Sequence, residues 1–141
     1  MRRSGQGMYR WTHMQRSTRQ REAIQAAIQD AGRPLSAHEI LQAAQREVPE
    51  IGIATVYRNL KLLQADGQVQ TVALPEQPPH YEISTHGHHH HFQCTICQRV
   101  FDVHACPGNL DKLAPRGFSV QRHELTLYGL CKDCRKSGAG A

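Results

Sequence analysis

The chain has 141 residues, 39% of them hydrophobic and only 6% aromatic, so it can bury one modest core or two small ones. No apolar stretch approaches the length of a membrane span, and the Arg-rich N-terminus lacks the apolar segment of a secretory signal, so we expect a cytoplasmic protein. The formal net charge is +5, and residues 1–72 carry +4 of it, with ten Lys or Arg against six Asp or Glu. Such an excess is typical of a polyanion binder, although proteins that bind no polyanion often show it as well.

Two amphipathic helices are predicted first in the chain. Apolar residues recur at helical spacing from Ile24 to Ala31, with Ser17 or Thr18 as the N-cap and Gly32 as the stop. The second helix is predicted to begin at the capping box Ser36-Ala37-His38-Glu39, inside a hydrophobic staple of Leu35 and Ile40, and to end before Pro49. Its apolar face is Ile40, Leu41, Ala44 and Val48.

A third helix is predicted over residues 54–65, ending at Asp66-Gly67. Its inward stripe is Val56, Leu60 and Leu63. The outward residues are Thr55, Tyr57, Arg58 and Lys61, which suit phosphate and base-edge contacts in a major groove but are also compatible with an ordinary solvated face. Strand character follows at residues 69–74 and 80–83, around a proline-rich loop at residues 75–79. Three helices and a hairpin predict a winged helix-turn-helix.

Two Cys-x-x-Cys pairs, Cys94 with Cys97 and Cys131 with Cys134, have the spacing that lets four thiolates meet at one tetrahedral zinc ion. We predict a closed structural site, since the pairing is duplicated and no secretory signal accompanies it; a redox dithiol or two disulfides are the alternatives. The 33 residues between the pairs leave room for strands and a helix. Cys106 is left over, and we expect a buried or half-buried free thiol there, with a metal or redox role as the alternative.

A run of histidines, His88 to His91, precedes the first pair. In an extended strand, His89 and His91 would point to one face and His88 and His90 to the other, so one strand could serve two metal sites. Imidazoles beside carboxylates such as Glu82 and Asp102 suit divalent iron, manganese or zinc. A remnant of a purification tag is the mundane alternative, but the run is short and internal.

As an ordered set, these segments resemble the ferric uptake regulator family of bacterial metal-sensing repressors. The resemblance rests on residues 54–60, residues 88–97 and the segment from His123 to Cys131, and it covers roughly residues 16 to 134. It implies a homodimer whose winged helices bind a palindromic, AT-rich DNA operator. Tyr57 and Arg58 would be the principal DNA-contacting residues, and the four paired cysteines would hold structural zinc.

The resemblance also implies regulatory metal sites. Glu82, His89, His91 and Asp102 match the family's sensor ligands, and His88, His90 and His123 match a further site. Metal at the sensor would clamp a hinge and set the spacing of the two DNA-contacting helices. This chain departs from the pattern in having Arg33 where iron- and peroxide-sensing members have a His, so His80 or His38 is a candidate substitute. Asn109 stands where an acidic ligand of the further site is common, which predicts a weak or vacant site.

We therefore expect an α+β protein with residues 1–15 as a basic extension, 16–74 as the winged-helix DNA-binding domain and 75–84 as a hinge. Residues 85–136 would form a small α/β dimerisation and metal-binding domain stapled by the four-cysteine zinc site, and residues 137–141 a tail. The expected function is metal-dependent repression of metal-uptake genes, with zinc ahead of iron as the sensed metal. An iron- or manganese-dependent peroxide sensor is the alternative within the family.

Two functions outside the family remain less favoured. A zinc hydrolase or deaminase would use His80-Tyr81-Glu82 as a His-x-Glu motif, but Gln93 and Leu130, not proline, precede the two cysteine pairs. A metal-storage protein would not need the outward face of the third helix. We therefore expect a protein that is not an enzyme.

Overall fold

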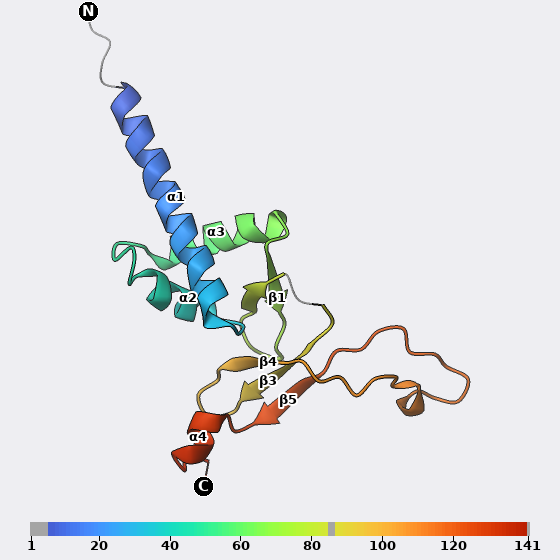
Figure 1. Ribbon diagram of the computed structural model, residues 1–141. Coiled ribbons are helices and arrows are strands. Elements are labelled where there is room, and N and C mark those ends of the chain that lie inside the picture. Colours follow the sequence, from blue (N-terminus) through green and yellow to red (C-terminus); the bar gives the residue numbers. More distant parts are fainter. Residues whose placement is uncertain (1–5, 85–86, 141) are drawn as a thin grey trace, which may run out of the picture. The chain divides into compact units, whose positions relative to one another are not determined.

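The computed structural model describes residues 6–84 and 87–140, and the chain forms two compact units, residues 1–85 and 86–141 (Figure 1). The first unit contains α1 (Gln6–Ala31), α2 (Ala37–Ala44), α3 (Ile53–Ala65), β1 (Val69–Val72) and β2 (His80–Ile83). The second contains β3 (His90–Cys94), β4 (Val100–Val103), the 3-10 helix η1 (Asp111–Leu113), β5 (Thr126–Gly129) and α4 (Lys132–Lys136). No helix in the described ranges has both the length and the hydropathy to cross a membrane.

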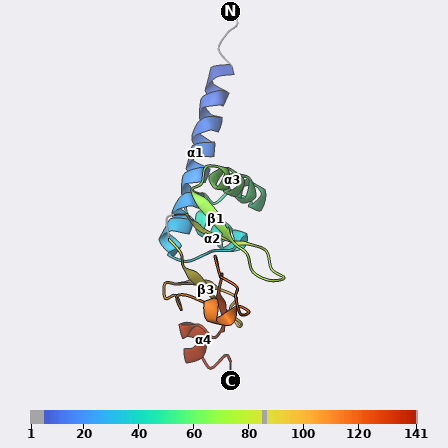
Figure 2. The ribbon, with the colours of Figure 1, turned by 90° about the vertical axis from the view of Figure 1, so that its right-hand side faces the viewer.

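Helix α1 is much longer than the sequence pattern indicates. It begins at Gln6, and its N-terminal part extends away from α2 and α3 (Figures 1 and 2). The predicted N-cap at Ser17 or Thr18 is wrong, because Thr18 lies inside the helix and its hydroxyl donates to the Met14 carbonyl one turn earlier. The predicted stop is confirmed: Gly32 has φ +61°, a conformation that glycine adopts without the steric cost of a Cβ.

Helix α2 begins as its capping box predicts. The Ser36 hydroxyl accepts from the Glu39 N–H at 3.2 Å, and the Glu39 carboxylate accepts from the Ser36 N–H at 2.9 Å. The helix ends at Ala44, however, and turns cover the residues before Pro49, so the expectation that Val48 belongs to the helix is wrong. Val48 is nevertheless buried, because these turns fold its side chain into the core.

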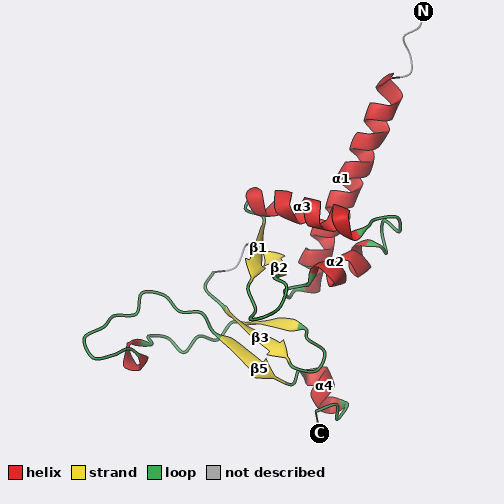
Figure 3. Cartoon of the chain, turned by 180° about the vertical axis from the view of Figure 1, so that it is seen from behind, coloured by secondary structure: helices red, strands yellow, loops and turns green. Residues whose placement is uncertain are grey.

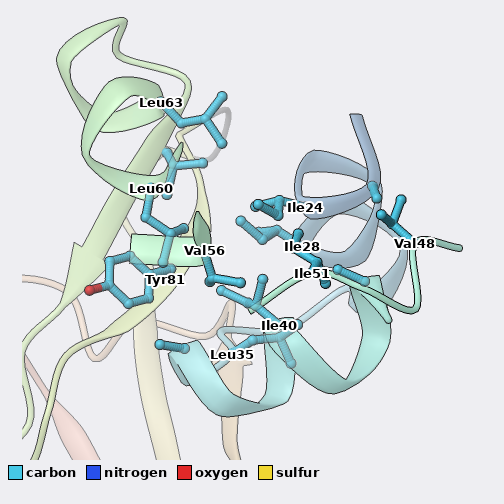
Figure 4. Packing of buried hydrophobic residues seen from close by; sticks show 14 residues of the cluster. Ile24, Ile28, Leu35, Ile40, Val48, Ile51, Val56, Leu60, Leu63 and Tyr81 are labelled. Atoms are coloured by element: carbon cyan, nitrogen blue, oxygen red, sulfur yellow. The ribbon is translucent and has the colours of Figure 1, made fainter. Parts of the chain in front are cut away.

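The core of the first unit joins all three helices to the hairpin. Figure 4 shows Ile24 and Ile28 of α1 facing Ile40 of α2, with Val56 and Leu60 of α3 completing the cluster. Each of these five side chains is 2% exposed or less. Burying such a side chain contributes about 1.5–3 kcal/mol, so this cluster stabilises the unit and fixes which face of α3 turns outward.

Backbone hydrogen bonds attach the hairpin to the segment just before α2. Strands β1 and β2 pair antiparallel, with Gln70 opposite Glu82. Leu35, just before α2, exchanges two backbone hydrogen bonds with Tyr81 of β2, at 2.9 and 2.8 Å. The predicted hairpin is therefore confirmed. Its second strand takes in residues 80–83, which lie inside the segment expected as a hinge.

The second unit is built around β3. The sheet order is β4-β3-β5, with β4 antiparallel and β5 parallel to β3. Between the cysteine pairs, where the spacing leaves room for strands and a helix, residues 98–130 are described throughout and contain strands β4 and β5, with η1, of three residues, as their only helix. Figure 3 shows the segment between β4 and β5 as a long loop interrupted by that short turn.

Candidate metal centres and DNA-binding face

The four paired cysteines come together in the second unit. Their sulfur atoms all lie within 4.8 Å of one another, and the Sγ atoms of Cys97 and Cys131 are 3.8 Å apart. Four sulfurs each about 2.3 Å from one tetrahedral zinc ion would be separated by about 3.8 Å. The donor set and its spacing therefore fit zinc in a closed, structural arrangement, as the spacing in the sequence predicts.

Strand pairing explains how two distant cysteine pairs meet. Parallel β5 places Gly129 beside Cys94, so the chain reaches Cys131 two residues later. A Cβ on Gly129 would lie 3.2 Å from the Phe92 ring, so glycine permits this close approach. Cys131 then starts α4, and its sulfur accepts from the Cys134 N–H at 3.5 Å as an N-cap.

Without a cation, the four thiols cannot all ionise. Backbone N–H groups, above all that of Cys131, lower the pKa of Cys94 to about 6, whereas burial and the adjacent thiols raise the pKa of Cys134 to about 12. Thiolates packed this closely repel each other, so a divalent cation is the species that would let all four carry charge.

A second cluster lies on one face of β3. His91 stands directly opposite Asp102 of β4, and His89 precedes it by two residues on the same face. The Nε2 atoms of His89 and His91 lie 3.4 and 3.6 Å from one Asp102 oxygen, and the centroids of the two imidazole rings are 4.9 Å apart. Two imidazoles and one carboxylate on one face are a donor set for iron(II), manganese or zinc.

A backbone contact sets the tautomer of His89. Its Nδ1 lies 2.8 Å from the Gly87 carbonyl oxygen, which can only accept, so Nδ1 carries the hydrogen in the neutral ring. The Nε2 lone pair then faces Asp102. A backbone carbonyl that fixes the tautomer in this way is a usual neighbour of a metal-binding imidazole.

The other expected sensor residues belong to the first unit. Glu82 is buried on β2, where its carboxylate accepts from the Gln70 side chain at 2.7 Å. His80 is also buried, and burial lowers its pKa despite the nearby Glu39 carboxylate, which favours the neutral ring. His38 is exposed on α2.

The opposite side of β3 carries a third cluster. His88, His90 and His123 come together as expected, and a fourth member, Cys106, joins them. Burial, together with the neighbouring imidazoles, lowers the pKa of His90 and so favours its neutral, metal-binding form. The sequence interpretation treated Cys106 as a leftover thiol and expected it to be buried or half-buried, but it is exposed. The signal that could have found it is its place at the start of the loop that returns to the sheet through His123.

The outward face of α3 has the expected composition. Tyr57 is 46% exposed, and Arg58 and Lys61 are exposed beside it. The Arg58 guanidinium donates to the Thr55 hydroxyl at 3.2 Å, one turn earlier, so these two polar groups lie together on the surface. Asn59 is buried, and its side chain donates to the Thr55 carbonyl.

A three-helix unit with a two-stranded wing, followed by a sheet unit with clustered metal donors, defines the class of metal-binding, winged-helix DNA-binding proteins. Within that class, residues 13–128 match the Ferric uptake regulator family, and the chain belongs to it. It is a metal-dependent, DNA-binding transcriptional repressor with a zinc site. Members of this family are non-enzymatic transcription factors, which excludes the hydrolase and deaminase alternatives.

Three similar proteins illustrate the likeness. The peroxide-responsive repressor PerR of Staphylococcus epidermidis is 31% identical over 126 residues, covering 87% of this chain and 83% of that protein. A solved structure described as a zinc-bound manganese uptake regulator is 26% identical, with a TM-score of 0.68 over 79% of this chain and 87% of that one. The Helicobacter pylori ferric uptake regulator Fur, at 21% identity, has a TM-score of 0.65 over 96% of this chain and 97% of that one, and so supports the fold.

Proposed function

We propose that this protein is a homodimeric, iron(II)- or manganese(II)-dependent repressor that responds to peroxide. The observation that carries the proposal is the cluster of His89, His91 and Asp102, because two imidazoles and one carboxylate form the donor set typical of iron(II) sites that react with oxygen species. The similarity to peroxide-responsive repressors points the same way. This was the alternative at the sequence level, where control of zinc uptake was the first expectation.

Glu82 is the proposed fourth ligand of this sensor, with His80 as a further candidate from the same strand. Glu82 and His89 are seven residues apart, so even a fully extended chain would keep them within about 25 Å. Metal held by ligands from both units would favour the arrangement in which both wings fit DNA, by binding that arrangement more tightly than the others.

The chemistry that iron(II) supplies when bound is the reduction of hydrogen peroxide next to the imidazole rings. In the net reaction, one of the two imidazoles, His89 or His91, would gain an oxygen atom at a ring carbon, and the peroxide would be reduced to water. An oxidised ring would be a poorer ligand, so the sensor would lose its metal and the repressor would leave the operator. Manganese(II) and zinc(II) would occupy the same donors without this reaction.

DNA binding is assigned to α3. Arg58 and Lys61 would contact phosphates or base edges, Tyr57 would pack against the bases or sugars, and Thr55 would hold the Arg58 side chain in place. In a homodimer joined through the second units, two such helices would face an AT-rich palindromic operator. Such a repressor would work in the cytoplasm, where bacterial DNA lies.

Control of metal uptake, with zinc or iron as the sensed metal, is the second candidate. It is favoured by Arg33, which stands where the resembled iron and peroxide sensors have a His. Arg33 donates to Glu39 at 2.7 Å, so this position is engaged in an ion pair inside the first unit. A sensor without that histidine would have one imidazole fewer to hold iron(II).

The test compares protein loaded with iron(II), manganese(II) or zinc(II) under anaerobic conditions, by fluorescence anisotropy on an AT-rich palindromic duplex. After hydrogen peroxide, only the iron(II) form should lose operator affinity, with one added oxygen on the peptide that carries His89 and His91. The variant His104→Ala removes an imidazole whose ring centroid lies 6.3 Å from that of His89 but which is not a member of the metal clusters, and it should behave like the wild type. An iron(II) form that keeps both its affinity and its mass after peroxide would reject peroxide sensing and favour metal-uptake control.

A further inference from the structure

The cluster of His88, His90, His123 and Cys106 is assembled by both neighbours of β3. Parallel pairing of β5 sets His91 beside Thr126, and continuing that alignment backward brings His123 beside His88. Antiparallel pairing of β4 sets His90 beside Val103, so the chain beyond Val103 also runs toward His88. Cys106, which follows β4, and His123, which precedes β5, thus both lie near the N-terminal end of β3, on opposite sides of it.

The spacing of the donor atoms matches one tetrahedral ion. The His123 Nε2 lies 3.2 Å from the Nε2 of both His88 and His90, and the Cys106 sulfur lies 3.4 and 3.6 Å from the Nε2 atoms of His123 and His88. For zinc–nitrogen and zinc–sulfur bonds of about 2.05 and 2.3 Å, a tetrahedral site would give about 3.3 Å between nitrogens and about 3.6 Å between nitrogen and sulfur.

Hydrogen bonds alone do not satisfy this arrangement. The Nε2 of His123 faces two ring nitrogens and a sulfur at hydrogen-bonding distance, yet a neutral ring nitrogen can either donate one hydrogen or accept through one lone pair. For at least two of these three neighbouring atoms, therefore, no hydrogen atom lies between the neighbour and the His123 Nε2. A cation at the centre is the group that turns converging lone pairs into favourable contacts.

A short turn at Gly108 contacts the Cys106 sulfur. Gly108 adopts φ +84°, and its N–H donates to the Cys106 sulfur at 3.4 Å. This hydrogen bond helps to fix the position of the sulfur, which lies 3.4 and 3.6 Å from the Nε2 atoms of His123 and His88. Asn109, the position at which an acidic ligand was expected, caps the η1 turn by accepting from the Asp111 N–H at 2.9 Å. Asn109 is thus engaged elsewhere, and the Cys106 sulfur, three residues earlier, is the fourth donor that joins the three imidazoles.

The resemblance already implies a metal site at His88, His90 and His123; we propose that the Cys106 thiolate completes it in place of the acidic ligand and makes it a closed site for zinc. A thiolate with three imidazoles favours zinc over iron(II) and manganese(II), whereas the donors of the His89 cluster are nitrogen and oxygen. The two faces of one strand thus serve different metals. This assignment does not depend on the metal that the sensor cluster holds.

Zinc at this site fastens the loop of residues 104–125 to the sheet. Apart from η1, this 22-residue loop has no secondary structure, and its Leu113 and Phe118 side chains are 79% and 68% exposed. Cys106 lies near its start and His123 near its end, so one ion closes the loop at its base. Closing a loop of this length restricts the chain chiefly through the conformations it removes.

The test measures alkylation of Cys106 by iodoacetamide, followed on its own peptide by mass spectrometry, in full-length protein that carries its structural zinc. Buffered zinc should protect Cys106 from alkylation, because the reacting thiolate would be bound to the metal, and manganese(II) should not. His123→Ala should abolish the protection, whereas the matched loop variant Asn109→Ala should keep it. Zinc should also slow amide hydrogen exchange in residues 104–125.

A second readout uses cobalt(II) in place of zinc. Wild-type protein should show a thiolate-to-cobalt charge-transfer band that saturates at one added ion, and Cys106→Ser should lack it. Equal alkylation rates with and without zinc, protection that survives in His123→Ala, or unchanged zinc affinity in Cys106→Ser would overturn the proposal.

Discussion

Replacing Cys131 with serine should unfold the second unit while the first unit stays folded. The change is selective because serine is also a good N-cap, so the hydrogen bond at the start of α4 can persist while one zinc ligand is lost. Among the described residues of the second unit, Val100 is the only buried hydrophobic side chain apart from Cys94 and Cys131. Burial of one valine contributes about 1.5–3 kcal/mol, whereas structural zinc supplies about 10–16 kcal/mol in small zinc-dependent domains. Zinc therefore dominates the stability of this unit.

The assay combines zinc analysis, hydrogen exchange and thermal melting. Cys131→Ser should lose the structural zinc and the exchange protection of β3, β4 and β5, and a dimer joined through the second units should dissociate. The helices of the first unit should still melt cooperatively, because their core is independent of the metal. Cys106→Ser is the control and should retain the structural zinc. A zinc-free Cys131→Ser protein with wild-type protection in β3 would refute the argument.

Four further results are expected. Tyr57→Ala and Arg58→Ala should each weaken operator binding by about 1–3 kcal/mol in anisotropy titrations, with metal content unchanged; wild-type affinity in both would reject the assignment of α3. Asp102→Ala should keep the structural zinc but lose the metal-induced gain in operator affinity, and a retained gain would place the sensor elsewhere. Ser36→Ala should cost the first unit about 1 kcal/mol in urea unfolding, unless the capping box contributes nothing. Burial raises the pKa of Glu39, but hydrogen bonds from Arg33 and the Ser36 N–H outweigh it and hold the pKa below the ordinary 4.5. The carboxylate therefore contributes stability above pH 4.5 that fades as the pH falls through the lowered value, and a Glu39→Gln variant should show a smaller loss over that range.

Local signals predict much of the first unit. The capping box at Ser36 and Glu39 and the glycine stop at Gly32 are set by hydrogen bonds between residues close in sequence, and both are confirmed. The start of α1 was missed because Ser17 and Thr18 resemble a cap although the helix continues through them. The short end of α2 was also missed, because the burial of Val48 depends on turns that bring it back to the core.

Long-range pairing in the second unit could not be derived in the same way. Alternation along β3 correctly divides the four histidines between two faces. The parallel pairing of β3 with β5, however, joins residues 35 apart, and no local pattern specifies that alignment. Since this pairing brings His123 beside His88, the membership of Cys106 in the third cluster becomes visible only once the sheet is formed.

The histidine run has a consequence for the fidelity of folding. If β3 slid by one residue against its neighbours, every side chain would change faces, yet each face would still receive histidines from the run. Both misassembled clusters could then bind metal, and the bound metal would stabilise the wrong strand register. Cys94 follows the run after only two residues, and the zinc ion that it shares with Cys131 permits a single alignment. The four-cysteine site thus fixes the register of β3. Chains that bind other metals before this zinc is in place are the ones in which β3 can pair in the wrong register.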